Sequence, residues 1–354
     1  MWTADAAFPG WRKNIVLVWL SQLLVMSGFD ATIPFIALLL RDQYGVISEG
    51  ERGIYMSMFY FFGMLGYVVS CPVWGALGDR FGIKIMLLRG TFLTAFIFPL
   101  MGYASEVWIL ITLRFITAAC AGTTSASQML LAKTVPDNRQ GFALGLLSTA
   151  VWSGSMLGNV IGGYTVHYFG YQMAFFLCGI MYFMAGIFVL FLQDAVKNNI
   201  PHDISVHKEK VPWLKRIHLP AFTVSVWLML LIFLLMGFMR RFEIPYLAMR
   251  IEQITGPDDA DKWTGLISAY VAAGALISGA VIGYLADKWR PFTLIIPGFL
   301  ASAVLLIVQA ITNDIFVFGT ARTLMYFFAG GLIPVSQKIL SIATPLRKRG
   351  TVFG

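Results

Sequence analysis

Apolar segments of about 20 residues, separated by short polar breaks, recur along nearly the whole chain, and a helix of that length crosses the hydrocarbon core of a bilayer. Only 12% of the 354 residues are charged, about half of the usual share in water-soluble domains. The pattern therefore predicts an all-α integral membrane protein. Its expected spans are 15–40, 54–77, 85–104, 107–131, 141–166, 171–192, 220–249, 264–286, 292–311 and 315–340.

The loops between these segments carry their Lys and Arg residues unequally. With the N terminus inside, sixteen basic residues fall on the cytoplasmic side and four on the outside, namely Arg41, Arg52, Arg250 and Lys262. Cytoplasmic loops collect Lys and Arg, so we expect a multi-pass protein of the inner (plasma) membrane with a cytoplasmic N terminus. The same rule accounts for the net charge of +8, and no nucleic-acid partner is expected.

The second part of the chain repeats the first. Arg114 recurs as Arg322 after 208 residues, and Pro34 in TIPFIAL recurs as Pro245 in EIPYLAM after 211 residues. GALGDRFG and SQML also recur, in order and at similar shifts. Parallel repeats of this kind predict two six-helix bundles, over 1–198 and 219–354, joined by a cytoplasmic linker over 199–218. We count ten spans and the start of an eleventh, so the second bundle is expected to be C-terminally incomplete.

The run WGALGDRFGIK between the second and third spans carries charge at the cytoplasmic end of a helix. Glycines allow a tight turn there, and a carboxylate held at a helix end in one conformation and released in another works as a latch. The run resembles the loop signature of the major facilitator superfamily, and a merely solvated loop is the alternative. The resemblance implies a conformational gate formed by Gly75, Asp79, Arg80, Gly82 and Lys84.

The fifth span, GLLSTAVWSGSMLGNVIGG, is rich in glycine at spacings of four, which place small residues on one helix face for close packing. Ordinary helix packing is the alternative. The span resembles the antiporter signature of drug:proton exporters, except that an asparagine replaces its proline. The matching residues are Gly145, Gly154, Gly158, Asn159, Gly162 and Gly163.

Residues 11–175 as a whole resemble MdtG-type multidrug exporters, in segments such as WRKNIVLVWLSQ and ALGLLSTAVWSGSMLGNVIGG. The second half resembles them less. The resemblance implies alternating access to a small-molecule substrate between the two bundles, driven by exchange with protons. We expect a monomer whose partners are the substrate, the proton and membrane lipid.

Two ionisable side chains fall inside spans of the first half, where a charge costs several kcal/mol and usually marks a transport pathway. Asp30 in the first span and Arg114 in the fourth are expected at similar depth, where they can pair. A carboxylate beside an arginine stays ionised and takes up a proton more readily when separated from it. We therefore expect proton coupling at Asp30 and Arg114, with a structural ion pair as the alternative.

The second half carries Arg240, Arg241 and Glu243 in its first span and Arg322 in its fourth. Three arginines suit an anionic or zwitterionic substrate, unless Glu243 neutralises one and the others reach toward the surface. Both interpretations stay open. Candidates for the substrate cavity are Met26, Phe29, Gln128, Arg241 and Glu243.

These patterns favour proton-coupled efflux of small drug-like molecules. The alternatives are proton-coupled uptake or exchange of an anionic or zwitterionic metabolite and, less favoured, a non-transporting membrane sensor. No enzyme is expected, because the sequence has no nucleotide-binding loop and no nucleophile elbow. The four histidines do not cluster, so neither a metal site nor a cofactor is expected.

Overall fold

The computed structural model describes residues 10–136, 139–193, 231, 243–288 and 291–343. All regular secondary structure in these ranges is helical, so the predicted helical fold is confirmed. The first half contains α1 (Trp11–Asp30), η1 (Ile33–Phe35), α2 (Ile36–Asp42), α3 (Glu49–Phe81), α4 (Ile83–Gly102), α5 (Val107–Cys120), α6 (Thr123–Thr134) and α7 (Gln140–Leu190). The second half contains η5 (Ile244–Tyr246), α9 (Leu247–Thr255), α10 (Ala260–Lys288), α11 (Pro291–Ile311) and α12 (Ile315–Ala343).

Among the described residues, five segments are long and apolar enough to cross a membrane: Trp11–Asp42, Glu49–Cys71, Ile83–Gly102, Val107–Thr134 and Gln140–Leu190. Large apolar side chains cover their outer surfaces; Phe96, Phe169 and Tyr168, for example, are each 65% exposed or more. A helix that is apolar on both its core face and its outer face needs lipid, not water, around it. The last segment joins the two predicted spans 141–166 and 171–192, with a single non-helical residue, Gly170, between them.

The first span is broken near its middle. Helix α1 ends at Asp30, and a short turn leads into the 3-10 helix η1, which carries Pro34. A proline has no N–H and its ring clashes with the carbonyl four residues earlier, which here belongs to Asp30. Proline thus accounts for the place of the break, and the equivalent Pro245 lies in η5 of the second half.

The fourth span is broken as well; neither break was predicted, because the spans 15–40 and 107–131 were expected to be continuous. Helix α5 ends at Cys120 and α6 begins at Thr123, and Gly122 between them has a φ of 107°. Trp74 of α3 donates a 2.7 Å hydrogen bond to the Ala119 carbonyl, and Arg89 of α4 donates to the Ala121 carbonyl. These two side chains satisfy carbonyls that the break removes from the helix ladder.

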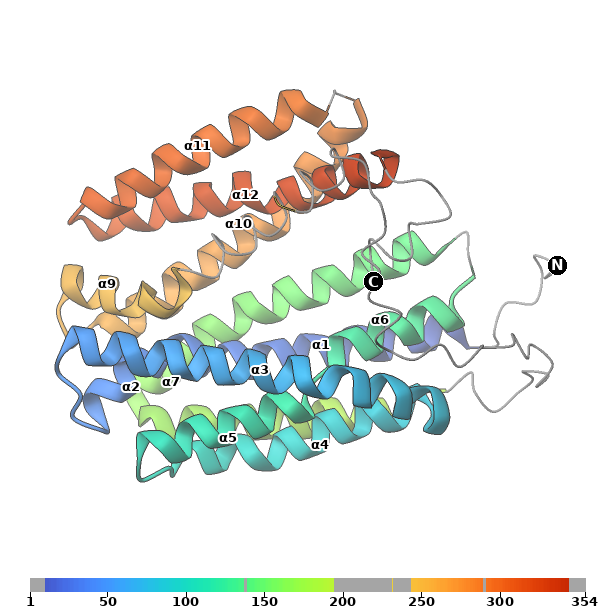
Figure 1. The fold of residues 1–354 in the computed structure, drawn as a ribbon, viewed down its shortest axis with the longest axis horizontal. Coiled ribbons are helices and arrows are strands. Elements are labelled where there is room, and N and C mark those ends of the chain that lie inside the picture. Colours follow the sequence, from blue (N-terminus) through green and yellow to red (C-terminus); the bar gives the residue numbers. More distant parts are fainter. Residues whose placement is uncertain (1–9, 137–138, 194–230, 232–242, 289–290, 344–354) are drawn as a thin grey trace, which may run out of the picture.

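Figure 1 shows the helices of the first half, from blue to green, below α10, α11 and α12 in orange and red. Helix α7 packs along α1 within the first half and beside α10 of the second. The apolar core of the first half gathers around Phe35, Phe98 and Phe175. The predicted linker and most of the predicted seventh span lie outside the described residues, so the bundle boundaries stay a prediction.

Candidate functional site

Arg114 of α5 lies inside the first half among aromatic rings. Its guanidinium carbon stands 5.2 Å from the ring centre of Phe29 and 5.4 Å from that of Phe59. Glycine at position 63 of α3 leaves room for it, because a Cβ there would be 2.7 Å from the Arg114 Nε. Rings that face a cation in this way stabilise its charge where water is scarce.

Asp30 follows Phe29 and ends α1. Asp30 and Arg114 both lie within electrostatic range of Tyr182, a buried residue of α7. Proton coupling at these two residues stays a prediction. Met26 and Phe29, two predicted cavity residues, pack half-buried against the adjoining apolar core, whereas Gln128 is an exposed residue of α6.

The second half holds a closely paired carboxylate and guanidinium. Arg322 of α12 lies 2.9 Å from Glu243, which precedes η5, and it also donates to the Gln309 amide oxygen of α11 at 3.3 Å. The side chain of Arg322 is 5% exposed and that of Glu243 18%. Glu243 therefore neutralises Arg322, while Arg240 and Arg241 lie outside the described residues.

Three glycines of the antiporter-like motif press α7 against the backbone of α1. A Cβ at any of these glycines would collide with a backbone carbonyl oxygen of α1 or of the residue that follows it. Gly154 faces Leu23, Gly158 faces Ser27 and Gly162 faces Ala31. The Ser27 hydroxyl donates a 3.0 Å hydrogen bond to the Gly154 carbonyl. Contact this close requires glycine, because any side chain would hold the two helices apart.

Gly145 behaves differently from the other glycines of this motif, since nothing lies within 4 Å of the position that its Cβ would take. Asn159, which replaces the proline of the signature, is 4% exposed and donates to the Ser155 carbonyl at 2.8 Å. Helix α7 continues without a break at Asn159.

A second face of α7 meets α10 across the two halves. A Cβ at Gly163 would lie 3.1 Å from the Gly265 Cα, and a Cβ at Gly265 would lie 2.6 Å from the Asn159 carbonyl oxygen. One turn further along, His167 contacts Asp261 at 3.0 Å. The motif thus packs one face within its own half and another against the opposite half.

The two halves also meet through a polar cluster, which we call the clasp: Arg41, Arg52 and Glu252. Glu252 of α9 forms an ion pair with Arg41 of α2 at 2.9 Å and accepts a hydrogen bond from Arg52 of α3. Arg52 is 4% exposed. Gln253 donates to Glu49 beside the clasp. Sequence reasoning missed this cluster, although Arg41 and Arg52 are among the few basic residues in loops predicted to face outside.

Beside the clasp, Tyr246 of η5 packs against Gly53 of α3 and lies 3.4 Å from the Ser57 hydroxyl. Helices α2 and α9 lie at the left end of Figure 1. Where both partners are described residues, every hydrogen bond or ion pair between the halves lies toward this end. We call it the clasp end.

The loop motif between α3 and α4 occupies the opposite end of these helices. Gly75, Asp79 and Arg80 lie in the last two turns of α3, and their side chains are outside what the structure describes. Gly82 ends α3 with a φ of 97°, a conformation that glycine adopts without strain. Lys84 donates a 2.6 Å hydrogen bond to the Leu190 carbonyl at the end of α7. The latch itself stays a prediction.

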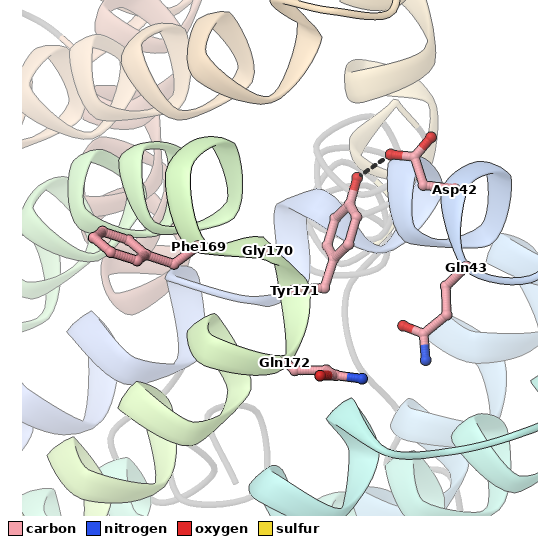
Figure 2. A pocket seen from close by; sticks show the side chains of 6 residues that line it. All are labelled: Asp42, Gln43, Phe169, Gly170, Tyr171 and Gln172. Carbon is pink, nitrogen blue, oxygen red and sulfur yellow. Dashed lines mark hydrogen bonds between the residues drawn. The ribbon is translucent and has the colours of Figure 1, made fainter.

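A pocket of about 260 Å³ lies beside the kink of α7 at Gly170, and Figure 2 shows the side chains that line it. Tyr171 donates a 2.6 Å hydrogen bond to Asp42 at its edge, and Gln43, Phe169, Gly170 and Gln172 complete its lining. All of these residues belong to the first half, so this cavity does not lie between the two bundles. In the described part of the chain, no three His, Cys, Asp or Glu residues are grouped to hold a metal ion.

Helices long and apolar enough to cross a membrane, in two halves that meet along α7 and α10, are typical of a membrane transporter. The chain belongs to the Major Facilitator Superfamily, which it matches over residues 18–354. It is accordingly a multi-pass membrane protein that carries small molecules by secondary transport.

Two relatives extend the similarity over nearly the whole chain. The sequence is 26% identical over 351 residues to the multidrug resistance protein MdtG of Dickeya zeae (strain Ech586), covering 99% of this chain and 84% of that protein. It is 28% identical over 345 residues to MdtG of Citrobacter koseri, covering 97% and 83%. The resemblance seen in residues 11–175 therefore continues through the second half.

Solved structures agree on the fold. A bacterial homolog of the human lysosomal transporter Spinster, in an inward-facing and unoccupied conformation, matches with a TM-score of 0.72 and 16% identity over 97% of this chain and 78% of that one. The nucleoside transporter NupG matches with a TM-score of 0.74 and 10% identity over 96% and 85%.

Proposed function

We propose that this protein exports small drug-like molecules in exchange for protons. The observation that supports the proposal is Arg114 held inside the first half beside Phe29 and Phe59, with Asp30 following Phe29 at the end of α1. A second support is the motif of α7, whose glycines press on the α1 helix that carries Asp30. The multidrug resistance proteins to which the chain is similar point to drug-like substrates.

Asp30 is suited to carry the proton because of its surroundings. It ends α1 at the proline break and follows Phe29, whose ring centre lies 5.2 Å from the Arg114 guanidinium carbon. Movement that separates Asp30 from Arg114 leaves the carboxylate in an apolar place, where the protonated form is favoured. Alternating exposure of this group to the two sides of the membrane then carries protons inward.

We further propose that the clasp end faces outside, as the distribution of basic residues predicts, with the N terminus in the cytoplasm. With the halves joined there by Glu252 and by the contact of Gly163 with Gly265, this conformation is closed to the outside. Opening to the outside requires both contacts to separate. The transport pathway then runs between the two bundles of a single chain.

Uptake of an anionic metabolite is the weaker candidate, because Glu243 neutralises Arg322 among the residues that the structure describes. Anionic substrates crossing an apolar region need unpaired cationic partners. The experiment below includes an anionic probe for this reason.

The test uses the purified protein in proteoliposomes with an imposed pH gradient. Ethidium represents cationic drugs and fluorescein an anionic substrate, while a pH-sensitive dye reports proton flux. We expect ethidium-dependent proton flux that is lost in Asp30→Asn. The matched control, Asp258→Asn, changes an exposed loop carboxylate and should keep the flux. The proposal would be overturned if neither ethidium nor fluorescein elicited proton flux, or if the flux were unchanged in Asp30→Asn.

A further inference from the structure

We propose that Asn159 of α7 and Thr264 and Ser268 of α10 form the part of the substrate site that binds an uncharged hydroxyl or amide group of the transported molecule. The inference rests on the proposed export of drug-like molecules and deepens it by naming the chemistry that such a molecule presents. It starts from three buried polar atoms without partners, on the two helices along which the halves meet (Figure 1).

Each of the three side chains holds a polar atom without a hydrogen-bond partner in the described part of the chain: Oδ1 of Asn159, Oγ1 of Thr264 and Oγ of Ser268. Asn159 is 4% exposed and Thr264 is 0% exposed. Buried polar atoms without partners are rare in folded proteins and costly, because no water replaces the missing partner. A partner that arrives during transport removes this cost.

The hydroxyl groups of Thr264 and Ser268 do not use the local partner that a helix offers, the carbonyl oxygen four residues earlier. Thr117 of α5, by contrast, donates to that carbonyl at 3.0 Å. The other described serine and threonine hydroxyls that are buried without a partner, those of Ser21 and Thr94, belong to helices of the first half. The two hydroxyls of α10 differ from them because α10 adjoins the opposite half.

Asn159 and the two α10 residues lie at the contact between the halves. A Cβ at Gly265, the neighbour of Thr264, would lie 2.6 Å from the Asn159 carbonyl oxygen. Ser268 lies about one turn beyond Gly265 along α10. The two helices touch here in this conformation, so a substrate reaches the three side chains when the halves separate.

This contact lies midway along the membrane-spanning helices. Gly158, which precedes Asn159, faces the backbone of Ser27, and Ser27 is near the middle of the apolar segment Trp11–Asp42. Transporters built from two bundles bind their substrates near the midplane, between the bundles. The three side chains are therefore at the depth where a substrate binds.

Both helices turn these side chains away from the lipid-facing surface. On α10, Ile277 is 55% exposed and follows Ser268 by nine residues, which is about two and a half turns, so the two lie on opposite sides of the helix. On α7, Tyr168 is 65% exposed and follows Asn159 by the same nine residues. Asn159 and Ser268 therefore face the interior of the protein.

The substrate group that fits these side chains is uncharged. The amide oxygen of Asn159 accepts a hydrogen bond, while the hydroxyls of Thr264 and Ser268 each donate and accept, so a hydroxyl or an amide satisfies them. His167 and Asp261, the ionisable pair on the facing surfaces of α7 and α10, contact each other at 3.0 Å. An ionised group would find no unpaired counter-charge on these two described surfaces.

Equilibrium binding of radiolabelled chloramphenicol to the purified protein in detergent tests the site without any proton flux. Chloramphenicol is uncharged and carries hydroxyl and amide groups, whereas tetraphenylphosphonium, the control ligand, is a cation without hydrogen-bonding groups. We expect Ser268→Ala to lower the chloramphenicol affinity about fivefold, and Thr264→Val with Ser268→Ala about 30-fold. Asn159→Leu, which keeps the size of the side chain, should also lower it. Tetraphenylphosphonium affinity should not change in these variants, and Thr112→Val, which removes an exposed hydroxyl of α5, should leave both affinities unchanged.

Thermal unfolding of the same variants separates substrate binding from a structural role. Thr264→Val and Ser268→Ala replace hydroxyls without partners by apolar groups of similar size, so the buried polar atoms and their cost disappear. The melting temperature of the double variant should therefore stay equal or rise while its chloramphenicol affinity falls.

The outcomes keep this inference apart from the proposed proton exchange. Chloramphenicol that fails to bind the unmodified protein, or binds the double variant equally well, would overturn the site, while ethidium-driven proton flux is decided by its own experiment. Equal losses of affinity for both ligands, or a lower melting temperature of the double variant, would show that the hydroxyls support the packing of the two halves. Either result would overturn the inference as well.

Discussion

Arg41 and Glu252 occupy equivalent positions in the two repeats, 211 residues apart, and they form a 2.9 Å ion pair across the two halves. Residues close to a two-fold axis meet their own counterparts. Because one repeat carries arginine and the other glutamate at this position, the two side chains attract each other. Their ion pair holds the two halves together at this end.

Glu252→Gln should therefore open the clasp end. The change removes the charge that holds Arg41 and the buried Arg52, and the loss of a hydrogen bond to a charged group costs about 2 kcal/mol. We expect the equilibrium to move toward the outward-open form by roughly 30-fold. The distance between spin labels attached at positions Gln43 and Lys262 measures this shift, and the share of molecules with the longer distance should increase. Glu49→Gln, which changes an exposed neighbour, is the control; equal shifts in both variants would contradict the role of the clasp.

Gly158→Ala should disrupt the packing of α7 on α1. The added Cβ collides with the backbone of Ser27, which cannot rotate away. We expect a loss of stability of about 1–3 kcal/mol, as in other overpacked cores. Thermal unfolding in detergent measures it. Gly145→Ala changes the same motif at a position where the Cβ meets open space, so this variant should keep the stability of the unmodified protein. Equal losses of stability in the two variants would show that the space beside the glycine is irrelevant.

Gly63→Ala should move Arg114 without changing either charged residue. The new methyl group would stand 2.7 Å from the Arg114 Nε, so the guanidinium must shift away from its place between Phe29 and Phe59. Displacement of a working group by about 1 Å costs on the order of 100-fold in rate. Ethidium-driven proton flux in proteoliposomes is the measurement. Gly50→Ala, at the exposed start of the same helix, should be neutral, and normal flux in Gly63→Ala would show that the position of Arg114 is not critical.

Gly122→Ala should strain the break in the fourth span. Gly122 has a φ of 107°, which an L-residue adopts at a cost of about 1–3 kcal/mol. The variant should unfold at a lower temperature in detergent. Gly141→Ala lies inside a helix with open space around it, where alanine is favoured by about 1 kcal/mol. Its stability should rise or stay equal, and a rise in Gly122→Ala as well would mean that the break is dispensable.

The described spans followed from the sequence because each apolar segment is long enough to satisfy its own backbone inside lipid, so its existence depends on local composition. The break at Asp30 was not predicted, because the span 15–40 was expected to be continuous, although Pro34 acts on the carbonyl four residues before it. The repeat placed Arg322 opposite Arg114 by position alone. Each of these properties can be read from one segment of the sequence, or from two segments aligned with each other, without knowing how the helices pack.

The partners across the fold were decided only by the tertiary structure. Glu252 meets Arg41 and Arg52, and Gly163 meets Gly265, because two bundles approach each other in one particular way. The break at Gly122 depends on Trp74 and Arg89, two donors from other helices that satisfy the freed carbonyls. Contacts between residues 100 to 200 positions apart depend on how helices pack, and the hydropathy of the segments that carry them is the same whichever partners they meet.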